Sequence, residues 1–174
     1  AELESVFSVT EHPGEDELID AIANAEKIVC AGAGRVGLSV AGFAKRLRHL
    51  GKDSFWIDDV TLPRMTEGDM MLMGSGSGET ETMLTLARIA KRSGLTLALV
   101  TRASASQIRD IADIVVELPV ARMLEDSEVG GSVQPMTTLF EQSTAIFLDA
   151  IVLDLMQILG VSNSEMSERH NTIE

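Results

Sequence analysis

The chain of 174 residues is long enough to form one domain with a sizeable hydrophobic core. Its 45% of hydrophobic residues include five Phe, one Trp and no Tyr, so the aromatic platforms on which nucleic-acid-binding proteins stack bases are missing. A formal net charge of −13 opposes binding to DNA, RNA or an anionic membrane, because each of these needs clustered Lys or Arg.

Short apolar runs alternate along the chain with amphipathic segments of helical length, which is the pattern of βα units and a parallel sheet. Five strands are expected at residues 27–31, 54–57, 70–73, 96–100 and 114–118. Helices are expected at residues 15–25, 36–50, 79–93 and 104–111, with Gly51 and Gly94 as C-terminal stops, and one long helix at 136–159. The sequence therefore predicts a single α/β domain over residues 1–174, with one five-stranded parallel sheet.

Two polar segments lie towards the C-terminus. Residues 122–134 are expected to form a loop long enough to serve a purpose, and residues 161–174 a tail of the kind that usually frays. The N-terminus lacks the positive charge of a signal peptide, and Asp149 and Asp154 interrupt the most hydrophobic stretch. We therefore expect a cytoplasmic protein that does not enter a membrane.

The long helix at 136–159 carries more apolar residues than one helix face can hold. A helix that is apolar around most of its circumference is buried on several sides. We therefore expect a second copy of the chain to cover part of it, in a homo-oligomer. The alternative is a central helix within a monomer.

The segment at 74–80 reads GSGSGET and follows the third expected strand. Glycines, hydroxyls and a helix N-terminus that meet after a strand form a concavity for a phosphate. A Walker loop would need a Lys where Glu79 stands, so a nucleoside triphosphate is not expected. The hydroxyls of Ser75, Ser77 and Thr80, together with two or three amides, match the oxygens of a phosphate monoester. The alternative is a Gly/Ser turn in which Ser77 caps a helix.

A second glycine cluster, GAGRVG at residues 32–37, follows the first expected strand and matches the dinucleotide fingerprint G-x-G-x-x-G. Asp58 and Asp59 end the second strand, where a carboxylate could bind a ribose hydroxyl, so NAD is an alternative ligand. The chain is short for a dinucleotide domain plus a substrate domain, and the 74–80 loop is richer in hydroxyls. We therefore favour one small site at the carboxyl edge of the sheet, with the two glycine loops on opposite sides.

Glu141 lies one to two turns into the long helix, after Pro135 and among the apolar residues Leu139, Phe140 and Ile146. A carboxylate in apolar surroundings is a competent general base. The alternative is a solvated surface glutamate.

Metal and cysteine chemistry are not indicated. The three histidines make no pair with ligand spacing and there is no Cys/His cluster, so neither a metal nor a cofactor is expected. Cys30 stands in an apolar run and is expected to be a buried, inert thiol, with a nucleophile as the alternative.

These motifs resemble those of the SIS (sugar isomerase) domain family and, within it, those of the 6-phospho-3-hexuloisomerases. GSGSGET is shared by SIS domains in general. The other matching segments are GAGRVG (32–37), FAKRLRHLG (43–51), AKRSG (90–94), SVQPMTTLFEQ (132–142), FLDAIVLDLM (147–156) and the terminal RHNTIE. The LFEQ-containing segment and the RH-N-x-E ending are similar to the hexuloisomerases in particular.

The resemblance implies a Rossmann-like three-layer αβα sandwich, usually a tetramer, that interconverts 3-hexulose 6-phosphate and fructose 6-phosphate through a cis-enediol, as in the ribulose monophosphate pathway. Glu141 would be the base, and His170 in the tail would complete a site, either its own or that of a neighbouring subunit. The substrate would be bound by Gly34, Arg35, Arg46, Ser75, Gly76, Ser77, Thr80 and Ser132. The alternatives are an arabinose 5-phosphate or phosphoheptose isomerase of the same family, or a non-catalytic module that binds a sugar phosphate.

Overall fold

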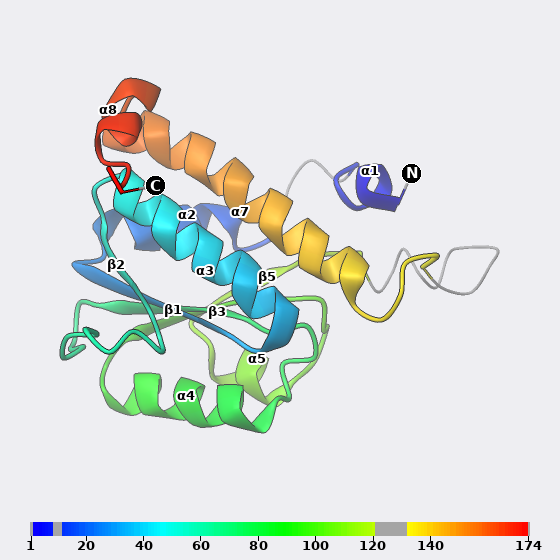
Figure 1. The fold of residues 1–174 in the computed structure, drawn as a ribbon. Coiled ribbons are helices and arrows are strands. Elements are labelled where there is room, and N and C mark those ends of the chain that lie inside the picture. The colour runs from blue at the N-terminus through cyan, green and yellow to red at the C-terminus, as the bar shows by residue number, and fades with distance from the viewer. Residues whose placement is uncertain (1, 9–11, 121–131, 174) are drawn as a thin grey trace.

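The computed structural model describes residues 2–8, 12–120 and 132–173, and Figure 1 shows their fold. Five parallel strands form one sheet in the order β2-β1-β3-β4-β5. The strands are β1 (Lys27–Gly32), β2 (Asp53–Trp56), β3 (Met70–Gly74), β4 (Thr96–Thr101) and β5 (Ile114–Glu117). The predicted five-stranded parallel sheet is confirmed, and every predicted strand boundary lies within one residue of the observed one.

Helices cover both faces of the sheet, so the molecule has three layers (Figure 1). One face carries α2 (Glu15–Asn24), α3 (Gly34–His49) and α7 (Thr138–Leu159), and the other carries α4 (Glu81–Arg92) and α5 (Gln107–Ile111). Two short helices, α1 (Glu2–Val6) and α8 (Asn163–Glu168), contact α7 and α3, respectively. The αβα sandwich is confirmed.

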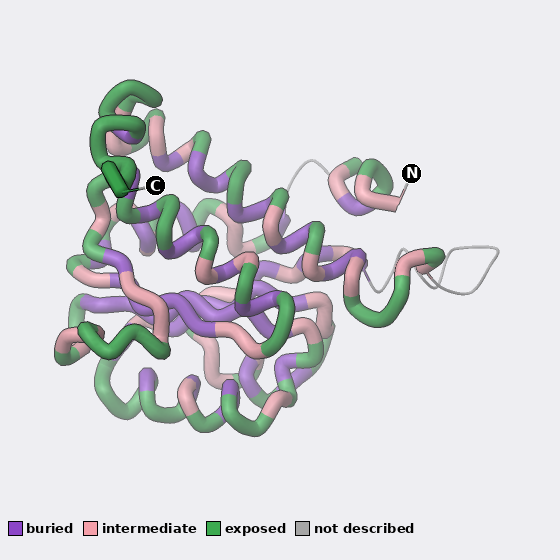
Figure 2. Tube along the Cα trace, in the orientation of Figure 1, coloured by how far each residue is buried: buried purple, intermediate pink, exposed green. Residues whose placement is uncertain are grey.

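The strands send alternate side chains into two hydrophobic layers, because successive residues of a strand point to opposite faces. The layer under α2, α3 and α7 contains Ile28, Cys30, Met70 and Leu72, and the layer above α4 and α5 contains Val29, Ala31, Met71 and Met73. Figure 2 shows this buried zone through the middle of the molecule. Cys30 is fully buried, as expected, and burial raises the pKa of its thiol to about 12.

The ends of β1 and β3 meet at the carboxyl edge of the sheet, where Gly32 pairs with Gly74. A methyl group on Gly74 would lie 2.6 Å from Val40 Cγ2, and one on Gly37 would lie 2.5 Å from the carbonyl oxygen of Gly32. These glycines therefore allow α3 to begin directly against the strand ends. The strand order reverses between β1 and β3, and open α/β sheets bind ligands at such a point.

At the amino edge, the buried carboxylate of Asp69 joins β1 to the turn before β3. It accepts hydrogen bonds from the amides of Lys27 at 3.0 Å and Thr66 at 2.7 Å, and Lys27 Nζ lies 3.0 Å away. Burial by itself would raise the pKa of Asp69. The hydrogen bonds from Thr66 and the ion pair with Lys27 outweigh burial, so the pKa of Asp69 is lowered.

Helix α7 has apolar surface on its inner and outer sides, as predicted. Phe140 and Phe147 are buried against the core, whereas Ile146, Leu153 and Ile158 are 44%, 62% and 56% exposed. By length and composition alone, α7 could also cross a membrane, but helices that pack in the core of a soluble domain pass the same test. By the geometry of the helix, Ile146 and Leu153 share one outer side, whereas Ile158 lies on another.

The tail is folded over its described residues, so the fraying expected for it is wrong. Ser162 and Glu165 form a reciprocal capping box at the start of α8, with hydrogen bonds of 2.7 and 3.2 Å. Arg169 Nη1 then donates to the carbonyl of His49 at 3.0 Å, and the ring of His170 stacks on that of His49 with 5.2 Å between centroids. These contacts hold the tail against the C-terminal end of α3.

Candidate active site

A cavity of about 460 Å³ opens at the carboxyl edge of the sheet, where β1, β3 and β4 end. Its lining comes from the segments that follow these three strands and from the beginning of α7. The lining residues are Ala33, Gly34, Arg35, Val36, Gly74, Ser75, Gly76, Ser77, Thr80, Arg102, Pro135, Met136, Thr137, Thr138, Phe140 and Glu141. Both glycine loops border one cavity, as the sequence predicted.

The hydroxyls of the loop after β3 are arranged as donors to the cavity. Ser75 Oγ accepts a hydrogen bond from the amide of Gly78, and Ser77 Oγ accepts one from the amide of Glu79, both at 3.2 Å. Each hydroxyl therefore keeps its proton for another acceptor. Thr80 is the N-cap residue of α4, yet its side chain makes no capping hydrogen bond. The alternative in which Ser77 caps this helix is wrong.

Glu79 holds the loop in place. Its carboxylate accepts hydrogen bonds from the side-chain amide of Gln107 at 2.7 Å and from the backbone amide of Gln107 at 2.8 Å, and these bonds lower the pKa of Glu79. The amide of Ile108 also donates to the carbonyl of Gly78 at 3.2 Å. The acidic residue that excludes a Walker loop therefore ties the loop after β3 to the N-terminus of α5.

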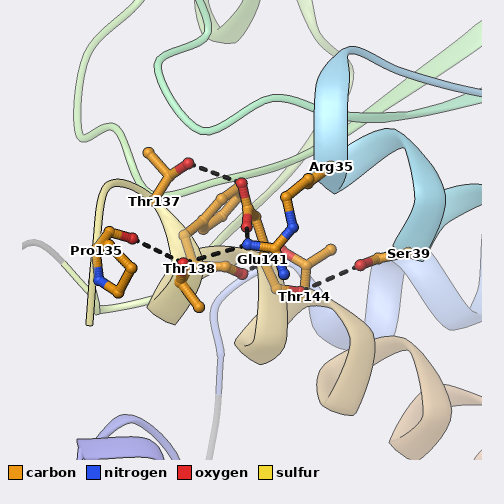
Figure 3. A network of polar contacts seen from close by, with 8 residues as sticks. Arg35, Ser39, Pro135, Thr137, Thr138, Glu141 and Thr144 are labelled. Carbon is orange, nitrogen blue, oxygen red and sulfur yellow. Dashed lines mark hydrogen bonds and ion pairs between the residues drawn. The ribbon is translucent and has the colours of Figure 1, made fainter.

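Glu141 lies in the first turn of α7 and points towards the start of α3 (Figure 3). Its Oε2 lies 2.7 Å from Arg35 Nη1, and its Oε1 accepts a hydrogen bond from Thr137 Oγ1 at 2.8 Å. Arg35 Nη1 also donates to Thr138 Oγ1 at 3.2 Å. The side chain of Glu141 is only 13% exposed, so it is not a solvated surface glutamate. The expectation of apolar surroundings is also wrong, because the carboxylate faces a guanidinium and a hydroxyl.

The turn before α7 is formed by a residue with an uncommon backbone. Met136 has a φ of 55°, in the left-handed region, and α7 begins at Thr138 rather than at residue 136 as predicted. Thr138 Oγ1 donates to the carbonyl of Pro135 at 2.7 Å and closes the turn. Non-glycine residues with such a backbone cluster at functional sites. Here the turn brings Thr137 against Glu141.

Three predicted site residues lie outside the cavity of their own chain. Arg46 is on the far half of α3, with its Nη1 3.3 Å from His49 Nδ1, and His170 stacks on the same histidine. The length of α3, roughly 20 Å at 1.5 Å per residue, separates this cluster from Arg35. Ser132 lies before the turn at Pro135 and does not line the cavity.

Arg102 is a lining residue that the sequence analysis missed. It is the first residue after β4, and its buried Nε has no hydrogen-bond partner among the described residues. A lone arginine after a strand matches no motif. Only the pairing of β4 with β3 places it beside the loop of residues 74–80, which we call the hydroxyl loop.

The charged groups of the lining suit acid–base chemistry on a small anion. They are one carboxylate, from Glu141, and two guanidinium groups, from Arg35 and Arg102. Within the described ranges, no three His, Cys, Asp or Glu side chains gather closely enough to hold a metal ion. The geometry therefore offers a candidate base, a cation beside it and a set of hydroxyl donors.

Comparisons with known proteins match most of the chain. The model of the SIS domain family matches residues 21–148. The chain is 35% identical to the 3-hexulose-6-phosphate isomerase of Bacillus subtilis over 159 residues, which are 91% of this chain and 86% of the relative. It is 34% identical to the 3-hexulose-6-phosphate isomerase of Methanocaldococcus jannaschii, over 89% of this chain and 81% of the relative. A crystal structure from Methanococcus jannaschii, whose inferred function is also 3-hexulose-6-phosphate isomerase, matches with a TM-score of 0.82 at 34% identity and covers 92% of this chain and 86% of that one.

Proposed function

The chain belongs to the SIS domain family, and from this premise we propose that it is an isomerase that interconverts 3-hexulose 6-phosphate and fructose 6-phosphate. Relatives at 34–35% identity over most of the chain bear the name of this activity. The structural observation that carries the proposal is one cavity lined both by the hydroxyl loop and by the carboxylate of Glu141.

The phosphate of the substrate binds at the loop after β3. The hydroxyls of Ser75, Ser77 and Thr80 donate to its oxygens, with the amides of Gly76 and Ser77 beside them. A phosphate monoester carries about −1.5 to −2 charge and three acceptor oxygens, which such a set of donors can match. Gly34 has a φ of 60°, which suits glycine, and no atom lies within 4 Å of the position that a Cβ would occupy. The sugar can therefore come close to the backbone after β1 at this residue.

The reaction moves a carbonyl group from C3 to C2 of the sugar. Glu141 takes the proton from C2, which gives a cis-enediolate. A proton then passes from O2 to O3, and the same carboxyl group returns the carbon-bound proton to C3, so that the carbonyl group lies at C2. A single base can serve both carbons because they are adjacent and the enediol is cis. The hydrogen bond from Thr137 to Oε1 fixes the orientation of the Glu141 carboxylate.

Arg35 has two tasks in this mechanism. Its ion pair with Glu141 compensates the charge of a carboxylate that is only 13% exposed. The arginine itself is 63% exposed, so its remaining N–H groups can donate to the substrate oxygen on which negative charge develops. Donors aimed at such an oxygen are among the strongest contributions to catalysis.

The proposal includes a homo-oligomer, with a tetramer as the expected form. Support comes from the exposed apolar residues Ile146, Leu153 and Ile158 on α7, because a second copy that covers them removes apolar surface from water. His170 lies roughly 20 Å from the cavity of its own chain by the length of α3, so its place in the mechanism is in the site of a neighbouring subunit. There it would assist the opening of the furanose ring of fructose 6-phosphate. A 3-ketose that is phosphorylated on O6 cannot close a furanose ring, so only fructose 6-phosphate needs this step.

The test is the formation of fructose 6-phosphate from 3-hexulose 6-phosphate by the purified protein, with Glu141→Gln as the variant. The proposal expects turnover by the wild type and a strong loss in the variant. No turnover by the wild type, with turnover of arabinose 5-phosphate or sedoheptulose 7-phosphate instead, would assign the chain to another SIS isomerase. Binding of hexose phosphate without turnover of any of these sugars would indicate a non-catalytic module.

A further inference from the structure

We propose that Arg102 is a phosphate-binding residue of this site, which supplies the cation that the GSGSGET loop itself lacks. The inference rests on the proposed function, because it assigns a further contact to the same substrate phosphate. It adds a cation to the hydroxyls and amides that the sequence analysis assigned to this phosphate.

The backbone that carries Arg102 is fixed to the hydroxyl loop on both sides of the arginine. Before it, the amide of Ser75 donates to the carbonyl of Val100 at 3.0 Å, and Thr101 Oγ1 donates to the carbonyl of Gly76 at 3.3 Å. After it, Gln107 donates two hydrogen bonds to Glu79. Arg102 is therefore presented to the loop by a braced segment.

The guanidinium of Arg102 lies against the middle of the hydroxyl loop. A Cβ at Gly76 would lie 3.5 Å from Arg102 Nε and 3.1 Å from the ring of Phe140, so the glycine is enclosed between the two side chains. The absence of a side chain at residue 76 thus allows the cation to approach the loop backbone. An anion bound by Ser75 and Ser77 is within reach of the same guanidinium.

The charge of Arg102 is not compensated within the described part of the protein. Its Nε is shielded from solvent and has no hydrogen-bond partner there, although the side chain is only half-buried. By contrast, Arg35 is paired with Glu141 across the same cavity. A cation that lacks both water and a protein acceptor at one nitrogen is costly, and an anionic ligand removes this cost.

The charge balance of the cavity indicates the kind of anion. Two arginines and one glutamate line it, which leaves one excess positive charge in a chain with a formal net charge of −13. A planar guanidinium donates two parallel hydrogen bonds to phosphate oxygens more readily than a lysine does. Since Arg102 adjoins Gly76 rather than Glu141, it meets the phosphate and leaves the reacting carbons to Glu141.

The experiment compares Arg102→Met, Arg102→Lys and the control Arg92→Met, which changes an exposed arginine in the last turn of α4. Binding of inorganic phosphate is measured by calorimetry, so this readout does not depend on catalysis. Kinetics with 3-hexulose 6-phosphate and thermal unfolding with and without phosphate are measured on the same samples. We expect Arg102→Met to weaken phosphate binding by about 10- to 100-fold and to raise KM similarly, with kcat nearly unchanged.

The other readouts separate binding from folding. We expect Arg102→Lys to recover part of the affinity, and Arg92→Met to behave as the wild type. Without phosphate, Arg102→Met should unfold at the same temperature as the wild type or higher, because an uncompensated cation is removed. At the same concentration, phosphate should then stabilise the wild type more than this variant.

Phosphate binding by Arg102→Met that equals the wild type would overturn the inference, as would a loss of kcat without a change in KM. A fall in unfolding temperature without a loss of phosphate affinity would also overturn it, because Arg102 would then be a structural residue. If the proposed function fails, the wild type does not turn over 3-hexulose 6-phosphate. The phosphate titration does not depend on turnover, so it still decides the role of Arg102.

Discussion

The carboxylate of Glu141 and the guanidinium of Arg35 form an ion pair of 2.7 Å that joins the first turn of α7 to the start of α3. The two helices pack along their length, so the pair sits where their N-terminal ends converge on the cavity (Figures 1 and 3). A base positioned in this way needs no movement of the backbone to reach its cation.

Glu141→Gln should lower kcat by about 10²–10⁴-fold, the usual range for the loss of a positioned base. The amide has the same shape and can still accept the hydrogen bond from Thr137, so the unfolding temperature should change little. Steady-state kinetics and thermal unfolding check both points. Glu17→Gln, an exposed change on α2, is the matched control and should keep wild-type kinetics. A variant at residue 141 with wild-type kcat would remove Glu141 from the mechanism.

Arg35→Met should lower kcat by roughly tenfold to a thousandfold, the range for removing one donor that stabilises a developing oxyanion. If part of this loss acts through Glu141, the two changes are not additive. In the Glu141→Gln background, Arg35→Met should therefore cost much less than in the wild type. Equal losses in the two backgrounds would mean that the arginine acts independently of the carboxylate.

Ser77→Ala should raise the KM for 3-hexulose 6-phosphate by about 5- to 30-fold with kcat nearly unchanged, as expected for one lost hydrogen bond to a charged ligand. Ser77 is exposed, so the fold should tolerate the change. Ser104→Ala, at another exposed serine, is the control. A fall in kcat with unchanged KM would place the hydroxyl at the reacting carbons instead of the phosphate.

The sheet and both loops at its carboxyl edge could be predicted because their signals are local. Each strand is a short apolar run, and Gly78 has a φ of 65°, a backbone that other residues adopt poorly. The cap of α8 was also readable, since Ser162 and Glu165 have the spacing of a capping box. The interpretation of this segment as a fraying tail overlooked that signal.

The rest of the site depends on contacts that a sequence pattern does not contain. Arg102 reaches the cavity because β4 pairs with β3, and the partner of Glu141 depends on how α3 and α7 cross. One separation was readable from the sequence, however. Arg35 and Arg46 lie on the same helix about 16 Å apart along its axis, too far for both to contact one small substrate in the same chain.

Asp69→Asn should reduce the free energy of unfolding at neutral pH by about 2–4 kcal/mol, because it removes a buried charge that Lys27 and two amides satisfy. The pKa of Asp69 is lowered in the folded protein, so its contribution is complete above the unfolded value of about 3.9 and is lost as the pH falls through the lower folded value. Urea unfolding at neutral and acidic pH measures this. The difference between wild type and variant should shrink below about pH 4. Asp20→Asn, an exposed change on α2, is the control, and an equal loss there would show that the effect is not specific to the buried carboxylate.

His170→Ala should slow the conversion of fructose 6-phosphate, the direction that needs ring opening, through a neighbouring subunit, and mixing can show this when activity is assayed in that direction. A site that combines Glu141 of one chain with His170 of another is intact when Glu141→Gln subunits assemble with His170→Ala subunits. We therefore expect two weakly active preparations to recover activity after they are dissociated and reassembled together, in proportion to the fraction of mixed oligomers. Each variant reassembled alone is the control. If His170 acts only in its own chain, no mixed oligomer contains an intact site from these two variants, and activity after mixing would stay at the average of the two parents.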